Sequence, residues 1–161
     1  MFEHEGGVEI KAQRPSFLNN VAVDLEITTP AGTHVDVHTG AGNVSICCLK
    51  GAAQVSTGAG NIDLDDQEGE IDAHTGAGNI DYQGAPQGDS RFEVGAGNIT
   101  LVLPADLSME VELQTGMGNI DVDFPVDGQA TGRRVQGAIG GGTQGSIYAQ
   151  TGAGNIDLIR R

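Results

Sequence analysis

The sequence predicts an all-β protein, a parallel β-solenoid (β-helix) with about 18 residues per coil. The first observation is a short motif, Thr-Gly-Ala-Gly-Asn-Ile-Asp at residues 75–81, that recurs with small changes along the chain. The second is 26 glycines against five prolines, with Gly at fixed positions in a period, which indicates turns and not disorder. The third is a period-two alternation of apolar and polar residues between the motifs, typical of strands.

Gly-Asn pairs mark the predicted corners of the solenoid, at steps of 18, 18, 19, 21 and 36 residues. The last step is twice 18, which predicts a degenerate copy at residues 137–139, and counting back 36 from the first pair reaches a similar start at residues 6–8. Markers at this spacing along the chain predict roughly eight to nine coils. Gly is expected where the corner backbone takes positive φ, and Asn is the next-best residue there and can form a hydrogen-bonded ladder. The structural corner residues are Gly42, Asn43, Gly60, Asn61, Gly78, Asn79, Gly97, Asn98, Gly118, Asn119, Gly154 and Asn155.

The 161 residues form one predicted domain, because a single repeat cannot bury its apolar face alone whereas a stack can. Residues 1–20 are expected as an irregular N-terminal coil with a strand at 7–10, followed by an alternating strand at 21–27. Regular repeats occupy 33–124. Residues 125–146 are predicted as a degenerate coil or loop, and the last repeat covers 147–159 with no cap after it. Parallel crossovers predict right-handed winding.

Four columns of residues share one parity of the repeat and are predicted to face inward. Aligning the units gives these columns: Thr39, Thr57, Thr75, Val94, Thr115 and Thr151; Val37, Val55, Ala73, Phe92, Leu113 and Ala149; Val35, Ala53, Ile71, Val111 and Ile147; and Val44, Ile62, Ile80, Ile99, Ile120 and Ile156.

The net charge of −14 argues against nucleic acid and anionic membrane surfaces as partners, since both require clustered Lys and Arg. No apolar run approaches the ~18 residues of a membrane span, so no direct membrane insertion is expected. Residues 1–20 do not resemble a signal peptide, which favours the cytoplasm unless an export segment is missing. Cys47 and Cys48 are the only cysteines. A disulfide between strand neighbours would be strained, which argues weakly against an oxidising compartment.

Aspartates follow the inward Ile in most repeats and are the weak candidates for a metal site. Calcium could bridge carboxylates on neighbouring coils. However, Ile stands where the calcium-binding nonapeptide repeat has its Asp ligand, so a solvated acidic face is favoured and no metal site is assigned. The candidates are Asp63, Asp81, Asp121 and Asp157.

No cofactor and no catalytic residue are predicted. The Gly-x-Gly elements lack the third Gly and the following helix of a dinucleotide or phosphate loop, and they recur in a strand context. No Ser-His-Asp or Cys-His group can be assembled.

The ends of the stack are the predicted contact surfaces. An uncapped coil presents unpaired N–H and C=O groups, so homo-oligomers through the solenoid ends are one expectation. The alternative is that Arg160 and Arg161 only blunt that edge.

The chain resembles the bacterial putative-adhesin family, a β-strand-repeat domain of unknown function. The resemblance is carried by the repeated T-x-x-G-N-I-D-L pattern, the Leu103-Pro104 corner and the late G-x-I-G-G-G-T…I-Y-A-Q-T-G-A-G-N-I-D-L segment, over roughly residues 20–158. It implies a β-solenoid of the cell envelope or cell surface and no catalytic residue.

The predicted function is therefore a non-catalytic structural or interaction module, an adhesin-like scaffold with an unknown protein or surface partner. The first alternative is a self-assembling subunit that stacks end to end into oligomers or filaments. The second is a calcium-dependent binding module.

Overall fold

The computed structural model describes residues 2–4, 7–9, 30 and 32–161. The contacts of the chain group it into two units, Met1–Pro30 and Ala31–Arg161, which are described separately. In the first unit β1 (Phe2–His4) pairs antiparallel with β2 (Gly7–Glu9). The repeat count predicted that the marker at residues 6–8 begins a parallel coil. The antiparallel pairing of residues 7–9 corrects this prediction. The strand predicted at 21–27 lies outside the described residues, so the single domain over 1–161 stays a prediction.

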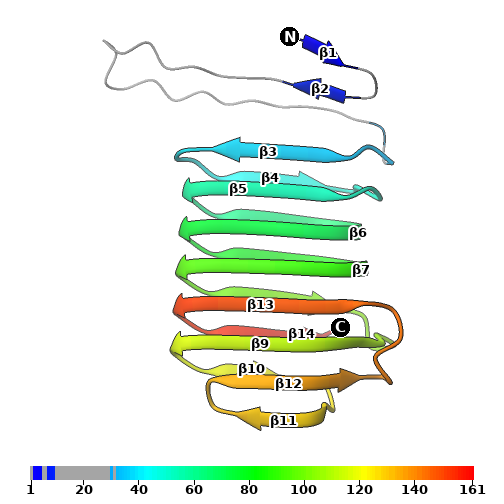
Figure 1. Cartoon of the computed structure of the whole chain (residues 1–161), viewed down its shortest axis with the longest axis vertical. Helices are drawn as coiled ribbons and strands as arrows, with labels where there is room; N and C mark the ends of the chain where they lie inside the picture. Colours follow the sequence, from blue (N-terminus) through cyan, green and yellow to red (C-terminus); the bar gives the residue numbers. More distant parts are fainter. Residues whose placement is uncertain (1, 5–6, 10–29, 31) are drawn as a thin grey trace. The chain divides into compact units, whose positions relative to one another are not determined.

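The second unit consists of strands that follow one another around a stack (Figure 1). Its strands are β3 (Val35–Thr39), β4 (Val44–Cys47), β5 (Ala53–Ala59), β6 (Ile62–Ala77), β7 (Ile80–Ala96), β8 (Ile99–Leu103), β9 (Met109–Met117), β10 (Ile120–Val122), β11 (Asp127–Thr131), β12 (Arg134–Ile139), β13 (Ser146–Ala153) and β14 (Ile156–Arg160).

Two rows of hydrogen-bonded strands face each other across the core. The front row runs β3-β5-β6-β7-β13-β9-β12-β11, and the back row runs β4-β6-β7-β8-β14-β10. The long strands β6 and β7 belong to both rows, because each begins in the back row and ends in the front row. The all-β, solenoid-like prediction is confirmed.

A layer of the stack is one front strand and the back strand that follows it through a Gly-Asn corner. In the first three layers the parallel register advances by one repeat of the sequence motif per layer, as in Val44↔Ile62↔Ile80. Six such layers occur among residues 32–161, fewer than the eight to nine coils predicted for the whole chain.

The inward columns are confirmed by burial. Most of their members are buried, including Phe92, Ile62, Ile80, Ile99 and Ile156 at 0% exposure. Inward residues of β3 and β10 are only half-buried, among them Val35, Val37 and Ile120. Among the described residues, β3 pairs only with β5 and β10 only with β14, so each has a neighbouring strand on one side.

The C-terminal repeat does not lie at the end of the stack, which corrects the prediction of an uncapped last coil. Residues 146–160, here called the insert, comprise β13 and β14. In the front row β13 lies between β7 and β9, and in the back row β14 lies between β8 and β10 (Figure 1). The 21-residue step between the corners at Asn98 and Asn119 includes residues 104–108, which pass the layer that the insert fills.

Residues 127–139 form an antiparallel hairpin, which corrects the degenerate coil or loop predicted over 125–146. Strand β11 pairs with β12, and β12 pairs antiparallel with β9. Thr131 pairs with Arg134, which leaves a two-residue turn, Gly132-Arg133, between the strands. The hairpin covers the front edge of the last layer, so the parallel stack ends there.

The corners need glycine for two separate reasons. The second glycine of every corner has positive φ, from 139° at Gly42 to 151° at Gly60. The first glycine lies against the carbonyl of the neighbouring layer: a Cβ on Gly58 would lie 2.5 Å from the Gly40 oxygen, and one on Gly76 would lie 2.6 Å from the Gly58 oxygen. Any side chain at these positions would separate the layers.

Corner asparagines form a continuous ladder through the six layers. The Oδ1 of each Asn accepts the backbone N–H of the Asn in the next layer at 2.9–3.0 Å, in the order Asn43, Asn61, Asn79, Asn98, Asn155 and Asn119. None of these asparagines has positive φ. Their role is thus to satisfy backbone N–H groups that the corner leaves outside the strand ladder.

Buried threonines provide a second set of bonds beside the ladder. The Oγ1 of Thr57, Thr75, Thr115 and Thr151 donates to a glycine carbonyl of the adjacent layer at 2.8–3.2 Å. The inward Thr column is therefore a structural hydrogen-bonding column.

We expect Gly58→Ala to lower the free energy of unfolding by about 1–3 kcal/mol, because the added Cβ meets the backbone of the layer beside it. Gly40→Ala is the matched control, since the equivalent Cβ in the first layer has no atom within 4 Å. Urea titration followed by circular dichroism compares them. Equal losses would contradict the close-approach explanation.

We expect Asn79→Ala to cost about 1 kcal/mol more than Asn119→Ala. The Asn79 side chain accepts the N–H of Asn98, whereas Asn119 is the last layer of the ladder and its Oδ1 accepts no corner N–H among the described residues. Thermal and urea unfolding of both variants measure the difference. If the two variants are equally stable, the ladder does not contribute to stability.

Candidate interaction face

Alternate residues of the front row point outward and form a polar face. Near its middle, five side chains from three consecutive strands make one connected group: His74 on β6, Arg91 and Glu93 on β7, and Tyr148 and Gln150 on β13. The strands place them side by side because Arg91 is in register with Tyr148, and Glu93 with both His74 and Gln150. We call this group the central cluster.

Arg91 is the hub of the central cluster. Its Nη2 lies 2.6 Å from Glu93 Oε1, and its Cζ lies 5.2 Å from the centroid of the Tyr148 ring, a cation–π distance. The Glu93 hydrogen bond and charge raise the pKa of Arg91, so it stays charged. The Tyr148 hydroxyl donates to Gln150 Oε1, and His74 Nδ1 lies 3.8 Å from Glu93 Oε2. The side chains of Arg91 and His74 remain about half exposed, at 55% and 51%.

Sequence reasoning did not find the central cluster because it placed the last repeat at the end of the stack. Arg91 and Tyr148 are far apart in the sequence, and only the insertion of β13 beside β7 brings them together. The two tyrosines also differ in environment. Tyr82 is buried, donates to the Gln67 carbonyl at 3.0 Å and has a pKa raised by that burial, whereas Tyr148 is half-buried on the outer face.

The candidate metal residues lie on the outer side of the back row in two pairs. Asp63 is in register with Asp81, Thr100 follows, and then Asp157 is in register with Asp121. An open cleft of about 240 Å³ runs along the first pair. Among the residues that the structure describes, no three His, Cys, Asp or Glu side chains gather as they would around a metal ion.

Asp157 is half-buried and lies beside Asp121 on the outer side of the back row. Partial burial, and then the neighbouring charge of Asp121, raise the pKa of its carboxyl above the ordinary value. Both causes penalise the ionised form in the folded protein. This pair therefore opposes folding at neutral pH.

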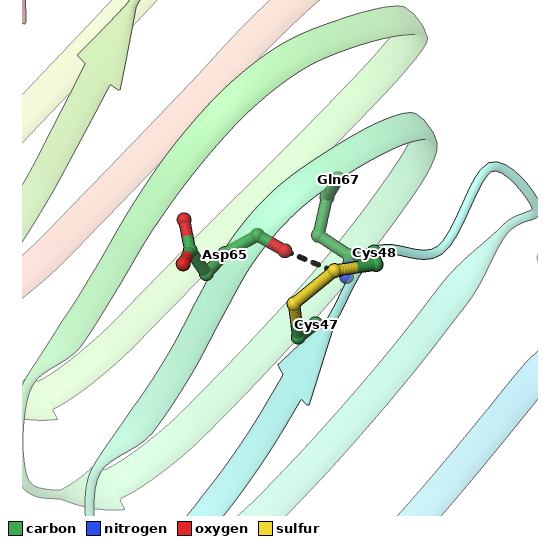
Figure 2. The surroundings of a disulfide bond; sticks show 4 residues. All are labelled: Cys47, Cys48, Asp65 and Gln67. Carbon is green, nitrogen blue, oxygen red and sulfur yellow. Dashed lines mark hydrogen bonds between the residues drawn. A yellow bond between two sulfur atoms is a disulfide. The ribbon is translucent and has the colours of Figure 1, made fainter. Parts of the chain in front are cut away.

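Cys47 and Cys48 form a disulfide, a bond that the sequence was expected to disfavour because it would be strained between strand neighbours (Figure 2). The expectation assumed extended backbone at both residues, but β4 ends at Cys47 and Cys48 has φ of 64°. The N–H of Cys48 donates to the Asp65 carbonyl of the next layer at 2.9 Å. The argument against an oxidising compartment therefore no longer holds.

The sequence matches the Toastrack DUF4097 family, a domain of unknown function, over residues 4–159. The chain belongs to this family. The match agrees with the resemblance to the putative-adhesin family derived from the repeat motif. No curated protein matches the sequence.

A solved structure described as a putative cell adhesion protein from Clostridium sporogenes has a similar fold. Its TM-score is 0.55 at 14% sequence identity, over 80% of this chain and 91% of that chain. At this identity the likeness shows the fold of the Toastrack domain alone. In the described part of the chain, no helix is both long and apolar enough to cross a bilayer.

We expect Asp121→Asn to stabilise the protein at pH 7. The pKa of Asp157 is raised in the folded protein above its unfolded value, so the free energy of unfolding falls as pH rises through the interval between the two values. The stability gained by Asp121→Asn should therefore vanish in acid, where both carboxyls are protonated. Urea unfolding at acidic and neutral pH measures it. Asp123→Asn removes the same charge nearby and should give a smaller gain; an equal gain would assign the effect to net charge.

Proposed function

We propose that this Toastrack domain is a non-catalytic interaction module, an adhesin-like scaffold of the cell envelope or surface. The family has no established function, and the structurally similar Clostridium protein is described as a putative cell adhesion protein. A regular stack that exposes polar side chains in fixed columns suits a surface that binds a partner. We take the winding as right-handed, as parallel crossovers favour.

The observation that carries the proposal is the central cluster. Tyr and Arg are the residues that most often dominate binding energy at protein interfaces, especially near the centre of the contact area. Here Arg91 and Tyr148 touch each other, and Glu93 and Gln150 hold their polar ends. Side chains fixed in this way lose little conformational freedom on binding.

The outer front face suits a polar partner surface better than a small ligand. Strands β6, β7, β13, β9 and β12 present charged and amide groups there, including the Arg134–Glu112 pair at 2.7 Å between β12 and β9. A separate cleft of about 370 Å³ shares no residue with the central cluster. It is lined by Ala85, Pro86, Gln87, Pro104, Asp106, Leu107 and Gln144. We therefore assign binding to the face.

The calcium-dependent alternative is less favoured. It needs carboxylates that converge on one ion, and the back-row aspartates form separate pairs with Thr100 between them. A melting temperature that rises with millimolar calcium and falls again with EDTA would favour it.

To test the proposal, we would attach the protein to fluorescent beads and count the beads bound to washed, intact Gram-positive and Gram-negative cells by flow cytometry. We expect wild-type beads to bind one cell type above uncoated beads. The double variant Arg91→Ala, Tyr148→Ala should lose at least about tenfold in affinity, since each hot-spot residue is worth about 2 kcal/mol or more.

Gln54→Ala with Ser56→Ala is the matched control, because these residues lie on the same face at β5, outside the central cluster. The control should bind like wild type. Wild-type beads that bind neither cell type would contradict the adhesion function, and equal binding by both double variants would contradict its assignment to the central cluster.

A further inference from the structure

The insert fills a slot with two complete walls. Strands β7 and β8 form one wall, and β9 and β10 form the other. Each wall continues in register into the insert, as in Phe92↔Ala149↔Leu113 and Ile99↔Ile156↔Ile120. The slot therefore recognises a strand, a Gly-Asn corner and a second strand, which is one whole repeat of this protein.

We propose that the slot accepts the insert of a second copy of this chain, so that two chains exchange residues 146–160 reciprocally. The exchange does not rest on the proposed adhesion function, but it changes that site. Arg91 belongs to the wall and Tyr148 to the insert. In the exchanged dimer, each central cluster is built from both chains.

Backbone bonds hold the insert from both sides and do not depend on which chain supplies it. On one wall Gly97 N donates to Ala153 O at 2.9 Å; on the other Gly154 N donates to Met117 O at 2.7 Å. The asparagine ladder passes through the insert in the same way, from Asn98 to Asn155 to Asn119. A second chain carries the same groups, so every bond can re-form in the dimer.

Side-chain burial makes the slot specific for this repeat. Ile147, Ala149, Thr151, Ile156 and Leu158 of the insert are all at most 1% exposed. Thr151 Oγ1 also donates to Gly97 O, and Ser146 Oγ to Asp89 Oδ1, both at 2.8 Å. An occupant must therefore match the apolar columns and the glycine corner together.

The insert is tied to the preceding strand by a short glycine-rich crossing. Among the described strands, β13 pairs with β7 and β9, whereas β12 lies on the opposite side of β9. Residues 140–145 cross from one side to the other, and Gly140, Gly141, Gly142 and Gly145 all have positive φ. Gly also adopts extended backbone readily, and six extended residues span roughly 20 Å. Straightened, this hinge would direct the insert into another molecule.

Exchange keeps the contacts of the closed monomer, so concentration and hinge strain decide between monomer and dimer. The closed monomer is favoured when dilute, because its insert is tethered beside its own slot. Leaving the slot breaks four parallel strand pairings, so exchange is slow in the folded state and is best established during refolding.

The test uses two full-length chains in a Cys47→Ser, Cys48→Ser background, one with Glu93→Cys and one with Gln150→Cys. These positions are in register across β7 and β13. The chains carry different tags, are mixed in guanidinium, are refolded at about 10 μM to 1 mM, and are treated with a short thiol-bridging reagent. We expect a cross-linked heterodimer whose yield rises with concentration, and a dimer mass by light scattering.

The matched control mixes chains with Asp36→Cys and Gln54→Cys, which are in register across β3 and β5 and stay within one chain after exchange. This mixture should give no product between chains. A single chain carrying both Glu93→Cys and Gln150→Cys shows that the reagent reaches the position. If that chain cross-links internally while the 93/150 mixture gives no heterodimer at any concentration, or if the control mixture cross-links equally, the proposal is overturned.

Deleting Gly141 and Gly142 in the wild-type chain provides a second test. The shortened hinge strains the crossing to the chain's own slot but leaves both walls unchanged. We expect the dimer fraction after refolding to rise at least about tenfold. A shortened chain that refolds to a monomer at every concentration would contradict exchange through this hinge. Cell binding by wild-type beads is scored separately, so adhesion and exchange can fail independently.

Discussion

The close approach of backbone at the Gly-Asn corners is the constraint on which the rest of the structure depends. Beyond the first layer, the first glycine of a corner lies so near the carbonyl of the adjacent layer that a Cβ would not fit, as at Gly58 and Gly76. This spacing lets Asn61 and its equivalents accept an N–H across layers and lets threonines reach the glycine carbonyls. The corner thus aligns the layers, and the inward columns pack in register as a consequence.

Identical corners also make the order of the layers ambiguous. Because every repeat presents the same corner glycines and the same asparagine acceptor, the corners alone do not decide which repeat stacks on which. This explains how a repeat from the end of the chain fits between β7 and β9 without a change in corner geometry. Contacts between residues so distant in the sequence close a long loop, which makes this layer a non-local element of the fold.

The insertion gives the front face its chemical character. Without β13, Arg91 would lack the aromatic ring on its open side, and the face would present charged and amide groups of neighbouring strands only. With β13 in place, a cation, a phenol ring and a carboxylate share one surface. The binding assignment and the chain exchange therefore concern the same layer.

The repeat motif by itself determined the strand periodicity, the inward columns and the glycine corners, because these depend on contacts that recur once in every repeat. It also indicated the family. The sequence did not determine the position of the last repeat, since equivalent corners make several stacking orders compatible with one pattern. Nor did it reveal the β11–β12 hairpin, whose strands run opposite to the repeats, or the Cys47–Cys48 disulfide, which needs a left-handed backbone after β4. Only the tertiary structure decided these features, and with them the central cluster, because Arg91 and Tyr148 become neighbours through strand order and not through sequence spacing.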